Sequence, residues 1–214
     1  MPLPVLWQDD HILICEKPSG ISSESPGLPD LIAQQAGRKV YPVHRLDRGT
    51  GGVVVLALSP EAAAAMQRLF VQDLVRKEYL AVVSGCPETD SGTYKDFLFH
   101  DRRTNRTFVV DRVRKGVREA FCEWSVLASA AEGGQVLSLV KVSLHTGRTH
   151  QIRVQFASRG FPLAGDRKYG GKIRAGAPAL WACGISFPHP FEKDVSVSVS
   201  SEPPSVFPWN LFGC

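Results

Sequence analysis

Short runs of alternating or continuous apolar residues dominate this chain, and helical patterns are few. VLWQ and HILICEKP flank Asp9-Asp10 and predict a hairpin, which the Pro and Gly of Lys17-Pro18-Ser19-Gly20 should end. Residues 21–39 are irregular in pattern, with a short helix expected near Asp30. The β-branched run at residues 53–58 predicts a strand that is buried on both faces.

One segment has a strong helix signal. Ser59 can cap the helix, Pro60 suits the first helical position and Glu61 complements the positive end of the helix dipole. Apolar residues then recur at helical spacing, at Ala62, Met66, Leu69, Phe70 and Leu74. We expect this helix to end near Arg76 and a strand to begin at Tyr79.

Strand-like alternation fills the second half of the chain. The residues expected to share faces are Ala120, Cys122, Trp124 and Val126, then Val136, Val140, Val142 and Leu144, and finally Val195, Val197 and Val199. Many strands and few helices indicate an α+β fold with a mixed, mostly antiparallel sheet and flanking helices, rather than a doubly wound nucleotide fold.

Length and composition indicate a single globular domain over residues 1–214. The chain is 43% hydrophobic and 21% charged, and no apolar stretch approaches the roughly 18 residues that cross a bilayer. The first residues lack the pattern of an export signal. Five cysteines without a C-x-x-C pair fit neither a disulfide framework nor a zinc ribbon, and are expected to be core groups in a reducing cytoplasm.

The net charge of +4 is unevenly distributed. Residues 102–118 hold seven basic residues against one acidic, and residues 148–174 repeat that balance, so each segment carries +6 and the rest of the chain −8. Either segment alone could be a merely solvated face. Together they give the chain a basic side that would attract a polyanion.

Familiar ligand-binding motifs are missing from the sequence. Gly49-Thr50-Gly51-Gly52 precedes a strand, whereas dinucleotide and P-loop motifs follow a strand and open a helix. There is no G-x-S-x-G elbow, and His44, His145 and His150 have no metal-ligand spacing. We therefore expect these histidines to be structural. Nothing in the sequence indicates a coiled coil, and a monomer is the simplest expectation.

Two segments contain more polar groups than packing requires. They are His44-Arg45-Leu46-Asp47-Arg48-Gly49-Thr50-Gly51-Gly52, running into the buried strand, and residues 145–153, HTGRTHQIR, at the end of an alternating strand. Taken alone, Asp47 between two arginines fits a structural ion pair as well as a catalytic group.

These segments resemble a known family. HRLDRGTGG is similar to the HRLDxxTSG signature of the RluA-type pseudouridine synthases, and HTGRTHQIRVQFASRGFPLAGDRKYGG resembles their TGRxHQ(I/L)RVH...GHPIxGDxxYG segment. DDHILICEKPSG and Arg76-Lys77-Glu78-Tyr79, similar to the K-x-Y step, also match, in family order between residues 9 and 171.

The resemblance implies a pseudouridine synthase fold with a central RNA-binding cleft, and isomerisation of uridine to pseudouridine in ribosomal or transfer RNA. It implies that Asp47 is the catalytic aspartate, Tyr79 the active-site tyrosine and Arg153 the arginine paired with that aspartate. Arg45 would occupy the space of the flipped nucleotide. An ionised carboxylate suits the positive character that develops at C1′ when the glycosidic bond breaks.

RNA contacts are expected from the signature segments and from residues 102–118, as a loop or hairpin that closes over folded RNA. The predicted RNA-binding residues are His44, Arg45, Arg48, Thr50, Arg102, Arg103, Arg106, Arg112, Arg114, Lys115, Arg148, His150 and Gln151.

The chain departs from the family pattern at three positions. Gly51 replaces a serine, Gln155 replaces a histidine, and Trp181 stands where a Leu-His-Ala pattern is common. Because the resemblance starts near residue 7, no N-terminal S4-type RNA-binding module is expected.

Two alternatives compete with this interpretation. One is an RNA-binding protein without turnover, although the joint presence of Asp47, Tyr79 and Arg153 argues against it. The other is a nucleoside or glycoside hydrolase, which usually needs two carboxyl groups around the bond, and neither signature offers an obvious second one.

Overall fold

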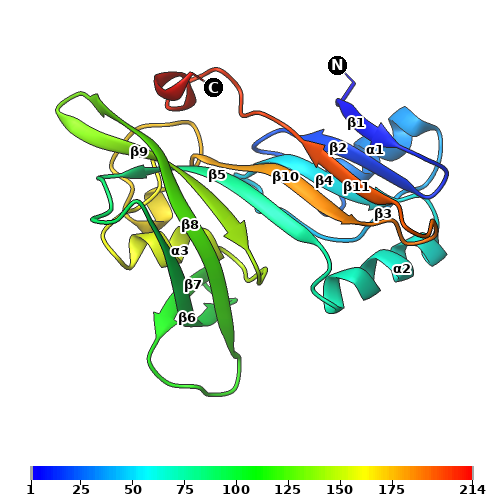
Figure 1. Cartoon of the computed structure of the whole chain (residues 1–214), viewed down its shortest axis with the longest axis horizontal. Coiled ribbons are helices and arrows are strands. Elements are labelled where there is room, and N and C mark those ends of the chain that lie inside the picture. Colours follow the sequence, from blue (N-terminus) through cyan, green and yellow to red (C-terminus); the bar gives the residue numbers. More distant parts are fainter. Residues whose placement is uncertain (1, 214) are drawn as a thin grey trace. The chain divides into compact units, whose positions relative to one another are not determined.

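The computed structural model describes residues 2–213, and the chain folds into two compact units (Figure 1). The first unit comprises Met1–Lys77 and Trp181–Pro203, and the second comprises Glu78–Leu180 and Pro204–Cys214. The expectation of one catalytic domain over residues 1–214 remains a prediction.

The first unit is a sheet with two helices. Its elements are β1 (Val5–Gln8), β2 (Ile12–Lys17), α1 (Leu28–Ala36), β3 (Tyr41–Pro42), β4 (Gly51–Ala57), α2 (Pro60–Val71), β10 (Leu180–Pro188) and β11 (Ser196–Ser200). Neighbouring strands follow the order β1-β2-β4-β10, with β11 beside β10 and β3 beside β4. The parallel pair is β4 with β10, and β1–β2, β2–β4, β3–β4 and β10–β11 are antiparallel.

The core of this unit confirms the predicted buried strand. Every residue of β4 is buried, because β2 and β10 flank it and α2 packs nearby. Ile12, Ile14, Val53, Val55 and Met66 form part of one apolar cluster. The expected hairpin around Asp9-Asp10 and the expected helix near Asp30 are both present, as β1–β2 and α1.

The second unit is built on antiparallel strands. Its elements are β5 (Arg76–Ser84), β6 (Ser91–Asp101), β7 (Arg106–Val110), β8 (Val117–Glu132), β9 (Gln135–Leu144), α3 (Gln151–Ala157) and the short 3-10 helices η1 (Arg167–Tyr169) and η2 (Trp209–Phe212). The strands follow the order β5-β9-β8-β6-β7. Strands β6, β7 and β8 extend to the loop at residues 111–116 (Figure 1). We call residues 102–118, from the β6–β7 turn to the start of β8, the arm.

One face of strands β6 and β8 packs against α3 and η1 of the same unit. Leu98 and Ala120 pack against Val154 of α3 and Tyr169 of η1. The residues at 102–118 form the β6–β7 turn, β7 and the following loop, as the sequence predicted for a hairpin. The fold class is therefore confirmed as α+β with a mixed, mostly antiparallel sheet. No helix within residues 2–213 has the length and apolarity needed to cross a membrane.

Three local predictions were wrong. Helix α2 ends at Val71 instead of near Arg76, because Asp73 takes a left-handed backbone conformation and Leu74 lies outside the helix, half-exposed. Val195, expected in a strand with Val197 and Val199, lies before β11 begins. Val136 lies on β9 as expected, at an exposed position. Among the cysteines, Cys15 and Cys122 are buried but Cys86 is exposed, and Cys214 lies outside the described residues.

Candidate active site

The turn that carries Asp47 is clamped by the segment that follows β2. Ser23 Oγ donates to Leu46 O at 2.9 Å and accepts from Leu46 N at 3.0 Å. On the far side of Asp47, Gly20 N donates to Arg48 O at 2.7 Å and Arg48 Nε donates to Gly20 O at 2.8 Å. Both neighbours of Asp47 are thus fixed by paired hydrogen bonds, which hold the backbone of the turn in one position.

A buried ammonium supports the same turn from inside. Lys17 is fully buried, and its Nζ donates to Ile21 O at 2.9 Å, to Pro18 O at 3.1 Å and to Arg48 O at 3.4 Å. Burial lowers the pKa of Lys17 to about 8, while the charge of Asp47 opposes that shift. The KPSG segment therefore acts on the signature turn through backbone carbonyls and through charge.

His44 stands at the start of the signature and is a structural residue in this unit. Its Nε2 accepts a hydrogen bond from Val55 N at 2.9 Å, and its ring lies 5.3 Å from that of Phe70. Burial lowers the pKa of His44 to about 4, and the neighbouring charge of Lys77 contributes to the same shift. The neutral ring ties the signature to β4.

The other signature side chains in this unit differ in exposure. Arg45 and Arg48 are exposed, and Arg45 forms an ion pair of 2.6 Å with Glu24. Thr50 is buried, and its Oγ1 makes no hydrogen bond to any residue in the described part of the chain. Its backbone N donates to Asp47 O at 2.9 Å and closes the turn.

Tyr79 and Arg153, the other predicted catalytic residues, belong to the second unit. Tyr79 lies on β5 opposite Val142 of β9, and its side chain is buried. Arg153 lies on α3 and is also buried. The meeting of these two residues with Asp47 in one active site is a prediction.

Arg153 has a partner that the sequence analysis did not identify. Its Nε donates to Asp166 Oδ2 at 2.6 Å and its Nη2 donates to Asp166 Oδ1 at 2.9 Å, so the pair is bidentate. Both side chains are almost completely buried. Asp166 is the one acidic residue among seven basic ones between Arg148 and Arg174, a signal that could have marked it as an internal counterion.

Tyr169 links this pair to the arm. The guanidinium of Arg153 lies 5.1 Å from the ring centroid of Tyr169. The hydroxyl of Tyr169 accepts from Thr107 N on β7 at 2.8 Å and lies 2.9 Å from His150 Nδ1. Thr107 Oγ1 in turn donates to Thr149 O at 2.8 Å. The β6–β7 hairpin and the loop before α3 are therefore joined by buried hydrogen bonds.

Gln151 organises the second signature. Its Oε1 accepts from Thr146 Oγ1 at 2.8 Å and from Arg148 N at 3.1 Å, and its Nε2 donates to Phe121 O at 3.2 Å. His150 and Gln151 are both buried. Gln155, a departure from the family pattern, is fully buried too and donates to Asp96 Oδ2 at 2.8 Å.

The predicted RNA-binding residues therefore fall into two groups. Thr50, His150 and Gln151 are buried, and His44 is half-buried. The exposed ones are Arg45, Arg48, Arg102, Arg103, Arg106, Arg112, Arg114, Lys115 and Arg148. Contact with RNA remains a prediction for both groups.

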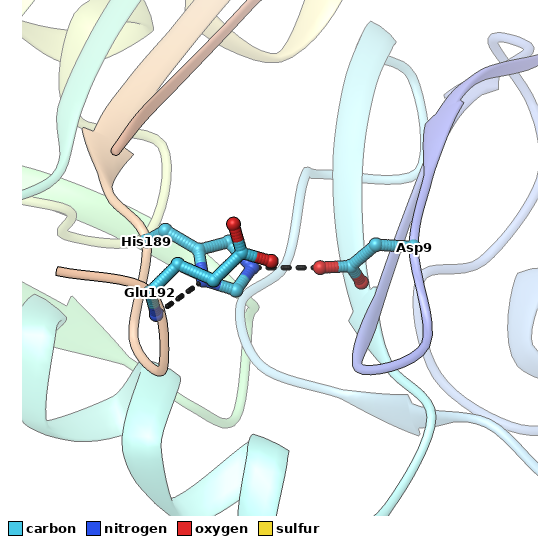
Figure 2. Close-up of side chains that lie close together, drawn as sticks. All are labelled: Asp9, His189 and Glu192. Atoms are coloured by element: carbon cyan, nitrogen blue, oxygen red, sulfur yellow. Dashed lines mark hydrogen bonds and ion pairs between the residues drawn. The ribbon is translucent and has the colours of Figure 1, made fainter. Parts of the chain in front are cut away.

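One cluster in the first unit has residue types that could ligate a metal. Figure 2 shows Asp9, His189 and Glu192, whose potential ligand atoms lie within 4.8 Å of one another. His189 Nδ1 accepts from Glu192 N at 2.9 Å, so its proton is assigned to Nε2, which lies 2.6 Å from Asp9 Oδ2. Both ring nitrogens of His189 are therefore hydrogen-bonded within the protein, and the cluster links the β1–β2 turn to the segment after β10.

Comparison of the sequence with known proteins identifies one family. The family described as RNA pseudouridylate synthase matches residues 11–158. An uncharacterized RNA pseudouridine synthase of Bacillus subtilis, YhcT, is 36% identical over 94% of this chain and 69% of its own length. The ribosomal large subunit pseudouridine synthase D of Nitrosomonas europaea is 33% identical over 91% of this chain and 60% of its own length.

A solved structure supports the fold. Human RNA pseudouridylate synthase domain containing 1 has a TM-score of 0.83 and 24% identity, covering 95% of this chain and 84% of that one. The chain spans about two thirds of the length of the curated relatives named above. With the signature turn and the α3 segment both inside the matched region, the chain belongs to the RNA pseudouridine synthases, a family of isomerases.

Proposed function

We propose that this protein converts uridine to pseudouridine within structured RNA, either ribosomal or transfer RNA. In this reaction the bond from N1 of uracil to C1′ breaks and C5 bonds to C1′ instead. The proton on C5 is released to solvent and N1 takes up a proton, so the product is an isomer of uridine. Family membership supports the reaction class. The name of the Nitrosomonas relative makes ribosomal RNA the first substrate to test.

The observation that carries this proposal is the fixed position of Asp47. Its neighbours Leu46 and Arg48 are hydrogen-bonded on both sides of it, and the buried ammonium of Lys17 adds a favourable charge. Such preorganisation suits a carboxylate that must meet the developing charge at C1′ as nucleophile or as electrostatic stabiliser. We assign Asp47 that role.

Arg153 and Tyr79 complete the proposed catalytic set. Asp166 engages one edge of the Arg153 guanidinium, and we propose that another of its N–H groups meets Asp47. Tyr79 would stack on the uracil ring and offer its hydroxyl for proton transfer at the sugar. The second carboxylate, Asp166, is neutralised by Arg153, which weighs against a two-carboxylate hydrolase.

RNA binding is assigned to the exposed arginines and Lys115. A stacked uridine has to be extruded before it can react, which costs a few kcal/mol. Phosphate contacts from the arm at residues 102–118 would offset that cost, and the Arg45 side chain would take the space of the extruded nucleotide. We further propose that the protein acts as a monomer in the cytoplasm, with no metal and no other cofactor.

The test is release of tritium from RNA transcripts labelled at C5 of uridine, with ribosomal and transfer RNA assayed separately. We expect release from one of them, and loss of about 10⁴-fold or more in Asp47→Asn, because the amide can neither attack nor stabilise C1′. RNA affinity should be unchanged in that variant. Mapping the modified site would then name the target uridine.

An RNA-binding protein without turnover is the alternative, because the exposed arm would serve either role. Assays of the unmodified protein distinguish the enzyme from the RNA-binding protein without turnover. If it binds both transcripts but releases no tritium from either, and Asp47→Ala binds equally well, the assignment as an enzyme is wrong.

A further inference from the structure

Two departures from the family signature face each other in the structure. Gly51 stands where the signature has serine, and Trp181 stands where a Leu-His-Ala pattern is common. Strands β4 and β10 lie side by side (Figure 1). Gly51 begins β4, Trp181 lies on β10, and the two residues are register partners in this parallel pair. Both belong to the first unit. The two positions, 130 residues apart in sequence, therefore form one local environment.

The indole ring of Trp181 fills the volume that a side chain at position 51 would need. A Cβ atom at Gly51 would lie 2.2 Å from Cζ3, 2.6 Å from Cε3 and 3.1 Å from Cη2 of Trp181. Separations below 3.0 Å cannot be accommodated unless one group moves. A serine at position 51 is therefore incompatible with this position of the ring.

The ring itself is held in place. Trp181 is buried, and its Nε1 donates to Ser201 Oγ at 3.3 Å. Ser201 Oγ donates to Glu16 Oε2 at 2.6 Å. This chain of hydrogen bonds crosses from β10 to β2, so the ring cannot swing away without losing a buried polar contact. The adjacent Gly52 is required for a different reason, since its φ is +113° and its Cβ would meet the backbone of Ala182.

Gly51 lies directly downstream of the catalytic turn. Thr50 N closes that turn on Asp47 O at 2.9 Å, and Gly51 follows as the first residue of β4. On the opposite edge of β4, Lys17 of β2 is the register partner of Gly52. The start of β4 thus lies between Lys17 and the Trp181 ring, and the residue before it, Thr50, is hydrogen-bonded to Asp47.

We propose that Trp181 is a positioning residue for Asp47 and that Gly51 and Trp181 are a compensated pair. The indole replaces the side chain lost at position 51 and sets where β4, and hence the turn, begins. The inference rests on the proposed function, because its main readout is turnover by Asp47. In this chain the indole of Trp181 packs beside the start of β4, where the HRLDxxTSG signature has a serine side chain.

The test is a double-mutant cycle of Gly51→Ser, Trp181→Leu and the combined variant, assayed by tritium release under saturating and limiting RNA. Gly51→Ser should lower kcat by about 30-fold, and Trp181→Leu by about 5-fold, because a displaced carboxylate loses alignment. KM should stay within about 3-fold of the parent in all three. The combined variant should recover kcat to within about 3-fold of the parent, because leucine leaves room for the serine.

Matched controls separate positioning from general destabilisation. Gly176→Ser adds a side chain at a glycine whose Cβ would meet nothing within 4 Å, and Trp124→Leu removes another buried indole, in the second unit. Both should keep kcat once rates are divided by the folded fraction, measured by near-UV circular dichroism. If the decreases in the cycle disappear after the same correction, the role of Trp181 is structural only and the proposal is overturned.

The remaining outcomes are also decisive. A combined variant no better than the worse single variant overturns the pairing, as does a Gly51→Ser variant with parental kcat. If Gly51→Ser does not fold, recovery of both folding and kcat in the combined variant supports the pair, and continued unfolding overturns it. Absence of tritium release from the parent would instead refute the proposed function. The free energies of unfolding of the same variants in urea would still measure the interaction between positions 51 and 181.

Discussion

The two basic segments carry the same net charge but use it differently. The arm at residues 102–118 and the segment at residues 148–174 are both +6. Every basic residue of the arm is exposed. In the other segment four basic side chains bind other parts of the protein: Arg148 to Glu119 O, Arg153 to Asp166, Arg159 to Asp96 and Lys168 to Asn105 O. Net charge along a sequence therefore does not say how much charge is available to a ligand.

The difference has an energetic consequence. An exposed arginine in the arm loses little by meeting a phosphate, and each such contact is weakened by salt. Arg153 and Asp166 form a buried ion pair. Removing one partner strongly destabilises the folded protein, because the remaining charge stays buried without a counterion. We expect variants in the arm to change binding, and variants around Arg153 to change stability and catalysis.

Among the variants that test this comparison of the two basic segments, the largest effect is expected at Asp166. Asp166→Ala leaves the buried guanidinium of Arg153 without its counterion, so the free energy of unfolding should fall by about 3–5 kcal/mol. Turnover per folded molecule should fall by about 100-fold, since Arg153 would lose its orientation. Urea unfolding and tritium release measure the two effects.

A double variant tests whether the loss of stability comes from the unpaired charge of Arg153. Arg153→Met combined with Asp166→Leu should recover most of the lost stability, because it removes both buried charges, but it should not recover turnover. An Asp166→Ala protein whose free energy of unfolding lies within about 1 kcal/mol of the parent's would contradict the expected cost of breaking a buried pair.

The next largest effect is the pH dependence of the free energy of unfolding. It arises from His44, which titrates, whereas the arginines of the arm stay charged. The pKa of His44 is about 4 in the folded protein and 6.5 in its ordinary state, because of burial. Between these values the unfolded chain binds the extra proton, so stability is present above pH 6.5 and falls as the pH decreases. We expect a loss of about 2 kcal/mol between about pH 7.5 and 5.

His44→Gln is the matched variant, because its amide oxygen can still accept from Val55 N. Its free energy of unfolding should change less than that of the parent over the same pH range. Equal slopes for the two proteins in urea titrations at several pH values would show that His44 is not the group that titrates.

The smallest effect tests the arm itself. Replacing Arg112, Arg114 and Lys115 by Gln should weaken RNA binding by about 10-fold near 0.1 M salt and reduce the slope of log affinity against log salt by about 2–3. The free energy of unfolding should stay within about 0.5 kcal/mol of the parent, as for exposed residues. Fluorescence anisotropy over a salt series measures both the affinity and the slope.

The control removes equal charge elsewhere. Arg68, Lys39 and Lys193 are exposed basic residues outside both segments, and their replacement by Gln should change affinity by less than about 2-fold. If this variant loses as much affinity as the arm variant, binding depends on net charge and the arm has no special role.

Local sequence signals predicted the cap of α2 and the first hairpin turn better than the limits of elements: the strand expected to begin at Tyr79 begins at Arg76. Ser59 Oγ accepts from Ala62 N as expected of a helix cap, and the hairpin at Asp9-Asp10 forms as predicted. The end of α2 was missed because the left-handed conformation of Asp73 has no strong local signature. Val136 shows a similar limit, since alternation identifies a face but not whether anything covers it.

In the candidate site, too, the sequence identified some residues and the tertiary structure revealed the others. The signatures identified Asp47, Tyr79 and Arg153 by resemblance, whereas the supports of Asp47 came only from coordinates: Ser23 and Lys17 lie 24 and 30 residues before it. Asp166 was visible in the matched segment but had no role assigned until its bidentate contact with Arg153 was seen.

The sequence by itself determined the fold class, the family and the order of the polar segments, because periodicity and motif spacing are local properties of a chain. The tertiary structure decided which charges are neutralised inside the protein, and it paired Gly51 with Trp181. Burial and steric exclusion depend on residues distant in sequence, and no local pattern encodes which side chains they will bring together.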